Sequence, residues 1–213
     1  MFHDRTDAGR QLADLIDRED VDGDVVLAIP RGGLPVARPV ADFLGAPLGV
    51  VVASKIGAPD NPELAVGAAT ADGSSWLNED VIERLGVSDE YVERERERET
   101  ENAREKIRQY RDGRDPPDIA GKRVVVVDDG IATGATVKAC LRQVAEAGAE
   151  HVTLAVPVAA PGVLEDLWVD ADEVVVVESP PHFTAVGQFY EDFGQISDEE
   201  AMTYLDDRGS RDG

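Results

Sequence analysis

The chain has 213 residues, of which 44 are acidic and 21 are lysine or arginine, giving a formal net charge of −23 at pH 7. This charge argues against a nucleic-acid partner, which needs a basic footprint, and against anionic membrane surfaces. The length suffices for one α/β domain with a full hydrophobic core.

The charge and the cysteine content also bear on the compartment. Because lysine is scarce and acids are abundant, we interpret the composition as adaptation to the high-salt cytoplasm of a halophile, where salt screens self-repulsion. An ordinary acidic protein is the alternative. Cys140 is the single cysteine, so no disulfide can form within the chain. Residues 1–7 lack the features of a signal peptide, and no apolar run reaches membrane length, so we expect a cytoplasmic protein.

The first fifty residues predict two helices and two strands. Thr6 is in position to cap the first helix, whose apolar residues share one face. An apolar run from Val25 to Ile29 predicts a strand, and the motif Pro30-Arg31-Gly32-Gly33 follows it directly. A second helix is expected next and ends at Gly45, before a strand over Val50 to Ala53.

The following segment is irregular and then strongly charged. Glycine and proline punctuate Ser54 to Thr70, which carries Lys55 and Glu63, so we predict a loop or a hairpin that is mobile. Ser88 can cap a long helix over about Asp89 to Tyr110. Opposite charges lie three residues apart in this helix and like charges four apart, so their energies roughly cancel. We expect a solvated helix that contacts the body near its end.

The second half of the chain alternates strands and helices. Val124 to Val127 is an unbroken β-branched run, typical of a strand buried on both faces of a parallel sheet. Further strands are expected over Val152 to Val156 and Val174 to Val177, with a short helix over Pro161 to Trp168 between them. This alternation predicts a mostly parallel sheet with right-handed crossovers, whose ligands bind at the carboxyl ends of the strands.

The turn after the central strand carries the strongest functional motif. Asp128 and Asp129 end the strand, and a loop of small and hydroxyl residues from Gly130 to Thr136 then opens a helix. Backbone amides and a helix N-terminus favour a phosphate group, and the hydroxyls of Thr133 and Thr136 add donors. The motif is neither a Walker loop nor a dinucleotide-binding turn. It therefore predicts a phosphate cradle beside two carboxylates.

Residues Val124 to Thr136 resemble the 5-phosphoribosyl-1-pyrophosphate (PRPP) signature of type I phosphoribosyltransferases over thirteen consecutive positions. Gly130 is the one departure, because the family usually has an apolar residue there. The resemblance implies a Rossmann-like α/β fold with a mostly parallel central sheet flanked by helices, a small hood and a mobile loop. We expect one domain over residues 1–213, with a core at about 20–180 and a hood or tail at 181–213.

The resemblance assigns roles within the motif. Asp128 and Asp129 are implied to hold the ribose hydroxyls, to act in catalysis and to be the protein ligands of Mg²⁺, the expected cofactor. Mg²⁺ needs few protein ligands here, because it keeps waters and binds phosphate oxygens. The loop is implied to wrap the 5′-phosphate. Its expected PRPP contacts are Ile131, Ala132, Thr133, Gly134, Ala135 and Thr136.

Two stretches earlier in the chain are expected at the pyrophosphate. Pro30 to Gly33 resembles the family's pyrophosphate-binding loop, which implies a binding role for Gly32 and a binding and catalytic role for Arg31. A plain strand-to-helix turn is the alternative. Lys55 follows an apolar strand and is expected as the second catalytic cation. For Glu63 two roles stay open, a general acid or base in a closed loop and a structural hydrogen-bond partner.

The acceptor is less well determined by the sequence. Ala132 stands where relatives that process 6-oxopurines carry an acid, which argues against hypoxanthine or guanine. Aromatic residues concentrate between Pro180 and Phe193, and we expect Phe183, then Tyr190, to stack on a planar acceptor. The alternative is that these rings pin a C-terminal tail onto the core.

The resemblance implies an enzyme of nucleotide metabolism. The expected activity is that of a glycosyltransferase of the pentosyl class: Mg²⁺-dependent transfer of 5-phosphoribosyl from PRPP to a purine or pyrimidine, with release of pyrophosphate. A regulatory protein that binds PRPP or a nucleotide without turnover is the alternative. The resemblance also implies a homodimer, and neither a nucleic acid nor a membrane is expected as a partner.

Overall fold

Five parallel strands form the centre of the computed structural model, which describes residues 1–206. They lie in the order β2-β1-β6-β7-β8, and every neighbouring pair is parallel. The strands are β1 (Val25–Ala28), β2 (Leu48–Val50), β6 (Arg123–Val127), β7 (His151–Val158) and β8 (Glu173–Glu178). The expected parallel α/β architecture is confirmed.

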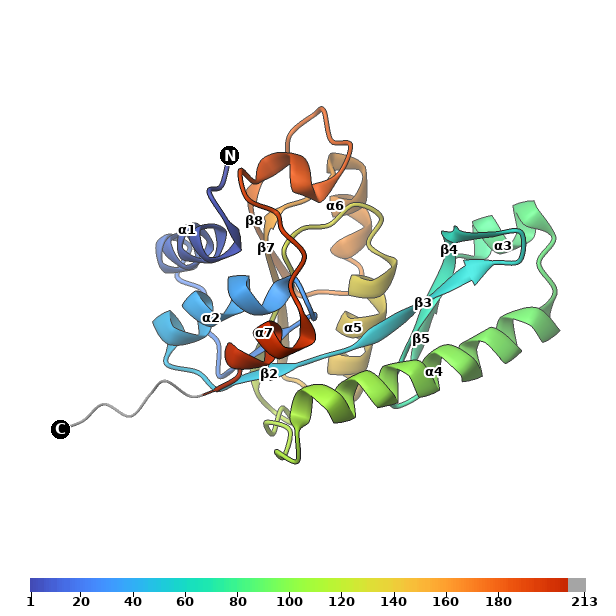
Figure 1. The fold of residues 1–213 in the computed structure, drawn as a ribbon, viewed down its shortest axis with the longest axis horizontal. Coiled ribbons are helices and arrows are strands. Elements are labelled where there is room, and N and C mark those ends of the chain that lie inside the picture. The colour runs from blue at the N-terminus through green and yellow to red at the C-terminus, as the bar shows by residue number, and fades with distance from the viewer. Residues whose placement is uncertain (207–213) are drawn as a thin grey trace.

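Helices cover both faces of this sheet (Figure 1). One face packs against α1 (Arg5–Arg18) and α2 (Gly33–Leu44), and the other packs against α5 (Ala135–Glu146) and α6 (Pro161–Leu167). Within β6, Val125 and Val127 belong to the first core, whereas Val124 and Val126 belong to the second. Because none of the four is more than 1% exposed, the prediction of a strand buried on both faces is confirmed.

A second, smaller sheet extends from this body as an arm (Figure 1). Its antiparallel strands are β3 (Ala53–Ala58), β4 (Asn61–Thr70) and β5 (Ser75–Leu77). The segment from Ser54 to Thr70 is therefore a hairpin, one of the two structures that its composition allowed. A small core of its own, which includes Ile56 and Val66, supports the arm.

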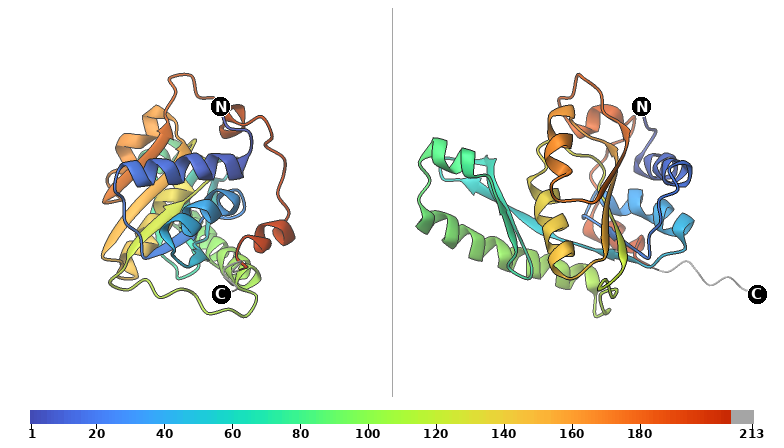
Figure 2. Two further views of the ribbon diagram at one scale, coloured as in Figure 1. Left: turned by 90° about the vertical axis from the view of Figure 1, so that its left-hand side faces the viewer. Right: turned by 180° about the vertical axis from the view of Figure 1, so that it is seen from behind.

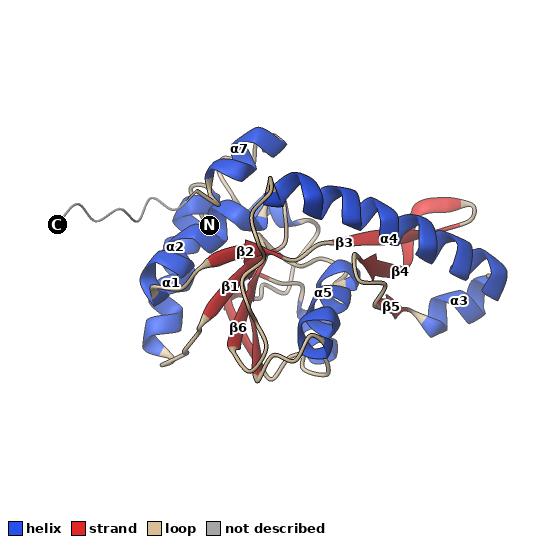
Figure 3. Cartoon of the chain, turned by 90° about the horizontal axis from the view of Figure 1, so that it is seen from below, coloured by secondary structure: helices blue, strands red, loops and turns tan. Residues whose placement is uncertain are grey.

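Two helices complete the arm, α3 (Glu79–Leu85) and α4 (Asp89–Arg111). Figure 3 shows α4 running alongside β3 and β4, and the hydroxyl of Tyr91 donates to the carbonyl of Gly57 on β3 at 2.9 Å. The end of α4 contacts the body through Ala103, Ile107 and Tyr110, as expected. The helix is less solvated than predicted, because Glu95 and Glu99 are also buried. Both carboxylates pair with Arg98.

The first residues of the chain pair with a segment that follows the last strand of the sheet. After β8 the chain forms a short 3-10 helix, η1 (Val186–Phe189), then an extended segment over residues 190–197, which we call the strap, and then α7 (Asp198–Thr203). The strap pairs with the first residues of the chain, because Phe2 bridges Tyr190 and donates its amide to the carbonyl of Phe189 at 2.8 Å. Figure 2 shows the strap running from the N-terminus to α7. The last part of the expected tail, residues 207–213, lies outside the described residues.

The start of α1 and the end of β2 differ from the prediction by a few residues. Asp4, not Thr6, caps α1, because its carboxylate accepts the amide of Asp7 at 2.7 Å and leaves Thr6 inside the first turn. The strand expected over Val50 to Ala53 is β2, which ends at Val50, because its partner β1 ends at Ala28. The chain then leaves the parallel sheet and enters the arm at Ala53.

Candidate active site

The turns after β1 and β6 lie against each other at the carboxyl edge of the sheet. A Cβ placed on Gly32 would lie 1.9 Å from Oδ2 of Asp129, and one on Gly33 would lie 2.7 Å from the carbonyl oxygen of Val127. The peptide bond between Pro30 and Arg31 is cis. Only glycine allows so close an approach, so the two motifs found in the sequence form one site.

The amide groups of the loop after Asp129 are available to a ligand. Within residues 1–206, the amides of residues 132–136 donate to no protein acceptor, and they lie at the start of α5. Gly134 takes a left-handed conformation with φ of +78°, which orients this turn. The amides of Arg31 and Gly32 are likewise without an acceptor in the described chain. The site therefore presents two groups of free donors suited to anions.

Ile131 has a different place from its neighbours in this loop. Its side chain is 2% exposed, its amide donates to the carbonyl of Val158 at 2.9 Å, and its carbonyl accepts the amide of Ala160. Neither its side chain nor its amide is left for a ligand, so the expectation that Ile131 contacts PRPP is corrected. This residue anchors the loop to the end of β7 instead.

The acid pair is half-buried, and only some of its carboxylate oxygens accept hydrogen bonds from the protein. Oδ1 of Asp128 accepts the amide of Asp129 at 2.8 Å, and Oδ2 of Asp129 accepts Nε of Arg5 at 2.7 Å. Burial raises the pKa of Asp128 well above its usual range, and the charge of Asp129 adds to this effect. Burial also raises the pKa of Asp129, although the ion pair with Arg5 opposes that shift. In the described chain, Oδ2 of Asp128 and Oδ1 of Asp129 accept no hydrogen bond, so each carboxylate has one oxygen left for hydroxyls or a cation.

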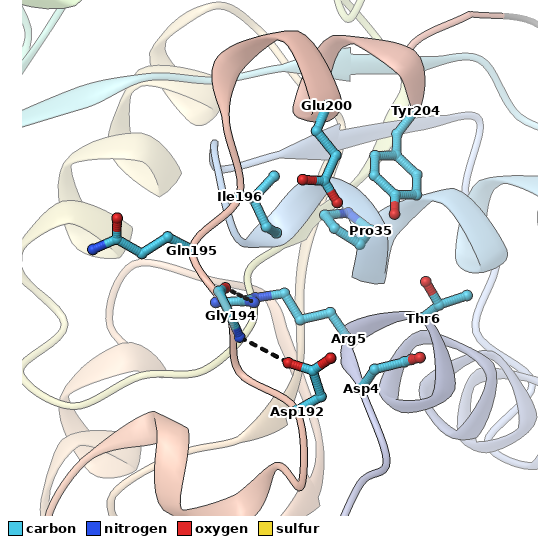
Figure 4. A pocket seen from close by; sticks show the side chains of 10 residues that line it. All are labelled: Asp4, Arg5, Thr6, Pro35, Asp192, Gly194, Gln195, Ile196, Glu200 and Tyr204. Carbon is cyan, nitrogen blue, oxygen red and sulfur yellow. Dashed lines mark hydrogen bonds between the residues drawn. The ribbon is translucent and has the colours of Figure 1, made fainter.

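Arg5 is the site residue that the sequence analysis did not identify. Its side chain is 12% exposed, its Nη1 donates to the carbonyl of Gly194 at 2.9 Å, and its guanidinium lies 3.8 Å from the centre of the Phe193 ring. Figure 4 shows Arg5 reaching from the start of α1 to the strap. One signal was present, because a cation in the first turn of a helix opposes the helix dipole and needs another reason to be there.

The two expected pyrophosphate cations are exposed and weakly paired. The side chain of Arg31 is 51% exposed, and its Nε lies 3.9 Å from Oδ1 of Asp198. Nζ of Lys55 lies 3.3 Å from both the carboxylate and the carbonyl of Glu63. Exposed pairs of this kind are readily exchanged for another anion. Of the two roles left open for Glu63, the geometry favours the hydrogen-bond partner.

The expected acceptor contacts lie in different surroundings. The ring of Tyr190 is covered by Phe2 and Phe193, and its hydroxyl donates to the carbonyl of Asp129 at 2.6 Å. Tyr190 therefore supports the main chain of the acid pair, and its ring does not present an open face on which an acceptor could stack. Phe183 is half-buried, with its ring 5.2 Å from that of Phe189.

Val186 of the hood occupies the space that the glycine at position 130 leaves. A Cβ on Gly130 would lie 2.6 Å from Cγ1 of Val186, so the side chain missing from the loop is replaced by one from η1.

Beside the strap, a cavity of about 310 Å³ opens between the first residues of the chain, α2 and α7 (Figure 4). Its wall includes Arg5 together with the carboxylates of Asp4, Asp192 and Glu200.

Neither a ready-made metal cluster nor a reactive thiol is found among the described residues. No group of three or more histidine, cysteine, aspartate or glutamate residues there could hold a metal by itself. Burial raises the pKa of the Cys140 thiol, which makes it a poor nucleophile. Among residues 1–206, no helix combines the length and the apolar character needed to cross a membrane.

Comparison with known families shows to which family the chain belongs. Residues 3–193 match the family model of the phosphoribosyl transferase domain. The chain belongs to this family.

Relatives of this phosphoribosyltransferase domain include longer and equally long proteins. Two curated Mycobacterium tuberculosis proteins, from strains H37Rv and CDC 1551 and provisionally named phosphoribosyl transferases, are 42% identical over 212 residues. These matches cover 100% of this chain and 48% of each relative, so the chain spans about half the length of the curated relatives it matches.

Solved structures share the fold. The crystal structure of TT1426 from Thermus thermophilus is 41% identical with a TM-score of 0.82, and the match covers 96% of this chain and 97% of that one. AQ2163 from Aquifex aeolicus, at 14% identity and a TM-score of 0.50, covers 86% of this chain and 78% of its own and is similar in fold alone.

Proposed function

We propose that this domain transfers the 5-phosphoribosyl group from PRPP to a nitrogenous base and releases pyrophosphate. The proposal depends on one observation, the contact between the turn at Gly32 and the carboxylate of Asp129. PRPP carries a phosphate at one end of its ribose and a pyrophosphate at the other. A site for it needs two groups of anion donors with hydroxyl acceptors between them, and the two turns supply this arrangement.

Each part of PRPP has a partner in this proposal. The amides of residues 132–136, with the hydroxyls of Thr133 and Thr136, hold the 5′-phosphate. The free carboxylate oxygens of Asp128 and Asp129 accept the ribose hydroxyls. The amides of the Pro30–Gly33 turn, with Arg31 and Lys55, bind the pyrophosphate.

The same carboxylates fit a magnesium ion. Mg²⁺ is a hard cation that binds one or two carboxylates together with phosphate oxygens and water, which matches two adjacent acids with one free oxygen each. The described residues contain no larger set of ligands, so the ion would arrive with PRPP. When bound, it would supply neutralising charge beside the leaving pyrophosphate. Asp128 and Asp129 would hold it.

The reaction forms one bond and breaks another at the anomeric carbon. A ring nitrogen of the acceptor donates its lone pair to C1 of the ribose, the bond from C1 to the pyrophosphate oxygen breaks, and that oxygen takes the electron pair. The acceptor base loses one N–H proton to water, which leaves a neutral base on the ribose. Positive charge develops on the ribose as this happens. Arg31 and Lys55 stabilise the growing charge on the pyrophosphate, and the held ribose keeps C1 facing the acceptor.

We assign the acceptor to the purines and pyrimidines, with Phe183 as the stacking residue. Phe183 is half-buried and so retains an accessible part for stacking. Tyr190 instead donates its hydroxyl to the main-chain carbonyl of Asp129. Ala132 provides no acid for a 6-oxopurine. We further propose a homodimer in the cytoplasm, acting in nucleotide metabolism.

A screen for pyrophosphate release tests the activity. The purified chain is incubated with PRPP, Mg²⁺ and KCl and with adenine, guanine, hypoxanthine, xanthine, uracil or orotate in turn. Release with one of these bases, lost in D128N/D129N, supports the proposal. A regulatory, non-catalytic role would appear instead as PRPP binding in calorimetry with no release for any base. The exposed cations Arg31 and Lys55 favour turnover.

A further inference from the structure

We propose that Arg5 is a positioning residue for the binding of PRPP. Arg5 holds the carboxylate of Asp129 in the orientation that the ribose requires. The inference rests on the proposed function. It means that the first residues of the chain and the strap complete a site whose binding groups lie mainly in the turns after β1 and β6.

The carboxylate of Asp129 is fixed from two sides. Nε of Arg5 donates to its Oδ2 at 2.7 Å, and the two side chains are only 12% and 15% exposed. On the other side, Gly32 is so close that a Cβ there would lie 1.9 Å from the same oxygen. With Oδ2 held between the guanidinium and the backbone of Gly32, Oδ1 is the oxygen left for the ligand.

Arg5 is itself held in place by the strap. Its Nη1 donates to the carbonyl of Gly194 at 2.9 Å, and the ring of Phe193 lies under the guanidinium at 3.8 Å. These contacts use two edges and one face of the guanidinium, which leaves little rotational freedom.

The same strap also supports the backbone of Asp129. The hydroxyl of Tyr190 donates to the carbonyl of Asp129 at 2.6 Å. The strap is joined to the first residues, because the amides of Glu191 and Asp192 each donate at 2.9 Å to the carbonyls of Phe2 and His3. Asp129 is thus held by its side chain through Arg5 and by its main chain through Tyr190.

The placement of Arg5 has a cost that a purely structural role does not explain. A cation at the start of α1 opposes the helix dipole, and its burial removes it from water. An apolar pair at this junction would stabilise the fold at least as well. A charged donor holds the carboxylate of Asp129 through one oxygen and leaves the other oxygen free for a ligand, which an apolar pair cannot do.

Calorimetric titration with Mg²⁺-PRPP of wild type, R5A, R5K and R10A tests the proposal. Arg10 is exposed on the same helix, so R10A is the control for charge and for α1. We expect R5A to raise the Kd for PRPP roughly tenfold or more, because an unpaired buried carboxylate loses its orientation, and R10A to leave it unchanged. R5K keeps the charge without the planar fork and should fall between.

Two further measurements separate positioning from a general structural effect. Added guanidinium ion should restore part of the PRPP affinity of R5A, and R5A/D129N should bind no more weakly than D129N, because Arg5 acts through Asp129. Wild-type affinity in R5A, no rescue, or an additive loss in the double variant would overturn the inference. If R5A does not fold, R5K decides, since wild-type affinity there has the same consequence.

The outcome for wild type separates this inference from the proposed function. If wild type does not bind PRPP, both are wrong. If wild type binds PRPP and R5A binds it equally well, the positioning role of Arg5 is wrong and the proposed function is not affected.

Discussion

The hydroxyl of Tyr190 donates to the main-chain carbonyl of Asp129 at 2.6 Å, across 61 positions of the sequence. Tyr190 is 6% exposed, and its ring contacts those of Phe2 and Phe193. A residue that the aromatic composition suggested as an acceptor contact is therefore a support for the acid pair. This hydrogen bond joins the strap directly to the main chain of the acid pair.

Y190F should remove the hydrogen bond that supports Asp129 without detaching the strap from the body. The substitution removes the hydrogen bond and leaves the carbonyl of Asp129 without this donor, so the free energy of unfolding should fall by about 1 kcal/mol. The Kd for PRPP should rise a few-fold, as measured by calorimetry. Y204F is the matched control, because the hydroxyl of Tyr204 makes no hydrogen bond among the described residues. Equal effects of the two variants would contradict the assignment.

G32A should disable the site through a steric clash. The new Cβ would lie 1.9 Å from Oδ2 of Asp129, so the carboxylate or the turn must move. PRPP binding should drop below detection in calorimetry. G162A is the control, since a Cβ on Gly162 meets nothing within 4 Å and should stabilise α6 slightly. Retention of wild-type affinity in G32A would show that the two turns can separate at little cost.

D128N should abolish turnover while leaving the protein at least as stable as wild type. Burial and the charge of Asp129 disfavour the ionised form of the Asp128 side chain, so replacing this carboxylate with an amide should raise the free energy of unfolding near neutral pH. Asparagine Oδ1 can still accept the amide of Asp129. Urea unfolding and pyrophosphate release check the two effects. A marked loss of stability would mean that the carboxylate is retained for the fold rather than for function.

H3Q should reduce stability in a pH-dependent way. The hydrogen bond from His3 to Glu191, at 3.0 Å, raises the pKa of His3 in the folded protein, and Asp4 and Asp7 contribute through their charges. This contribution is fully present below the pKa of an unfolded histidine and is lost as the pH rises through the higher folded value. The difference in unfolding midpoint between wild type and H3Q should therefore be larger at about pH 5.5 than at about pH 8.5. An unchanged difference would show that the pair does not help to hold the strap.

Salt should stabilise the protein. With a net charge of −23, self-repulsion destabilises the folded state at low ionic strength, and screening removes it. The unfolding midpoint should rise by several degrees between about 0.1 M and about 2 M KCl. Sorbitol at matched osmolality is the control for solvent exclusion. A midpoint that stays constant or falls with KCl would contradict the adaptation to high salt.

The sequence by itself determined the features that depend on neighbouring residues. The apolar run Val124 to Val127 can only be a strand buried on both faces, and the acids and small residues after it define a turn with free amides. Gly45 and Ser88 mark helix ends for reasons of backbone conformation and capping, and both do so in the structure. Such features need no information about distant parts of the chain.

Only the tertiary structure decided which distant residues complete the site. Arg5 and Asp129 are 124 positions apart, and no local pattern links them. The strap that carries Tyr190 and Gly194 has no regular periodicity, and its position follows from pairing with the first residues of the chain. Contacts of this kind form only when packing brings the first residues and the strap to the same edge of the sheet. Their energies lie in burial and geometry that a linear pattern does not contain.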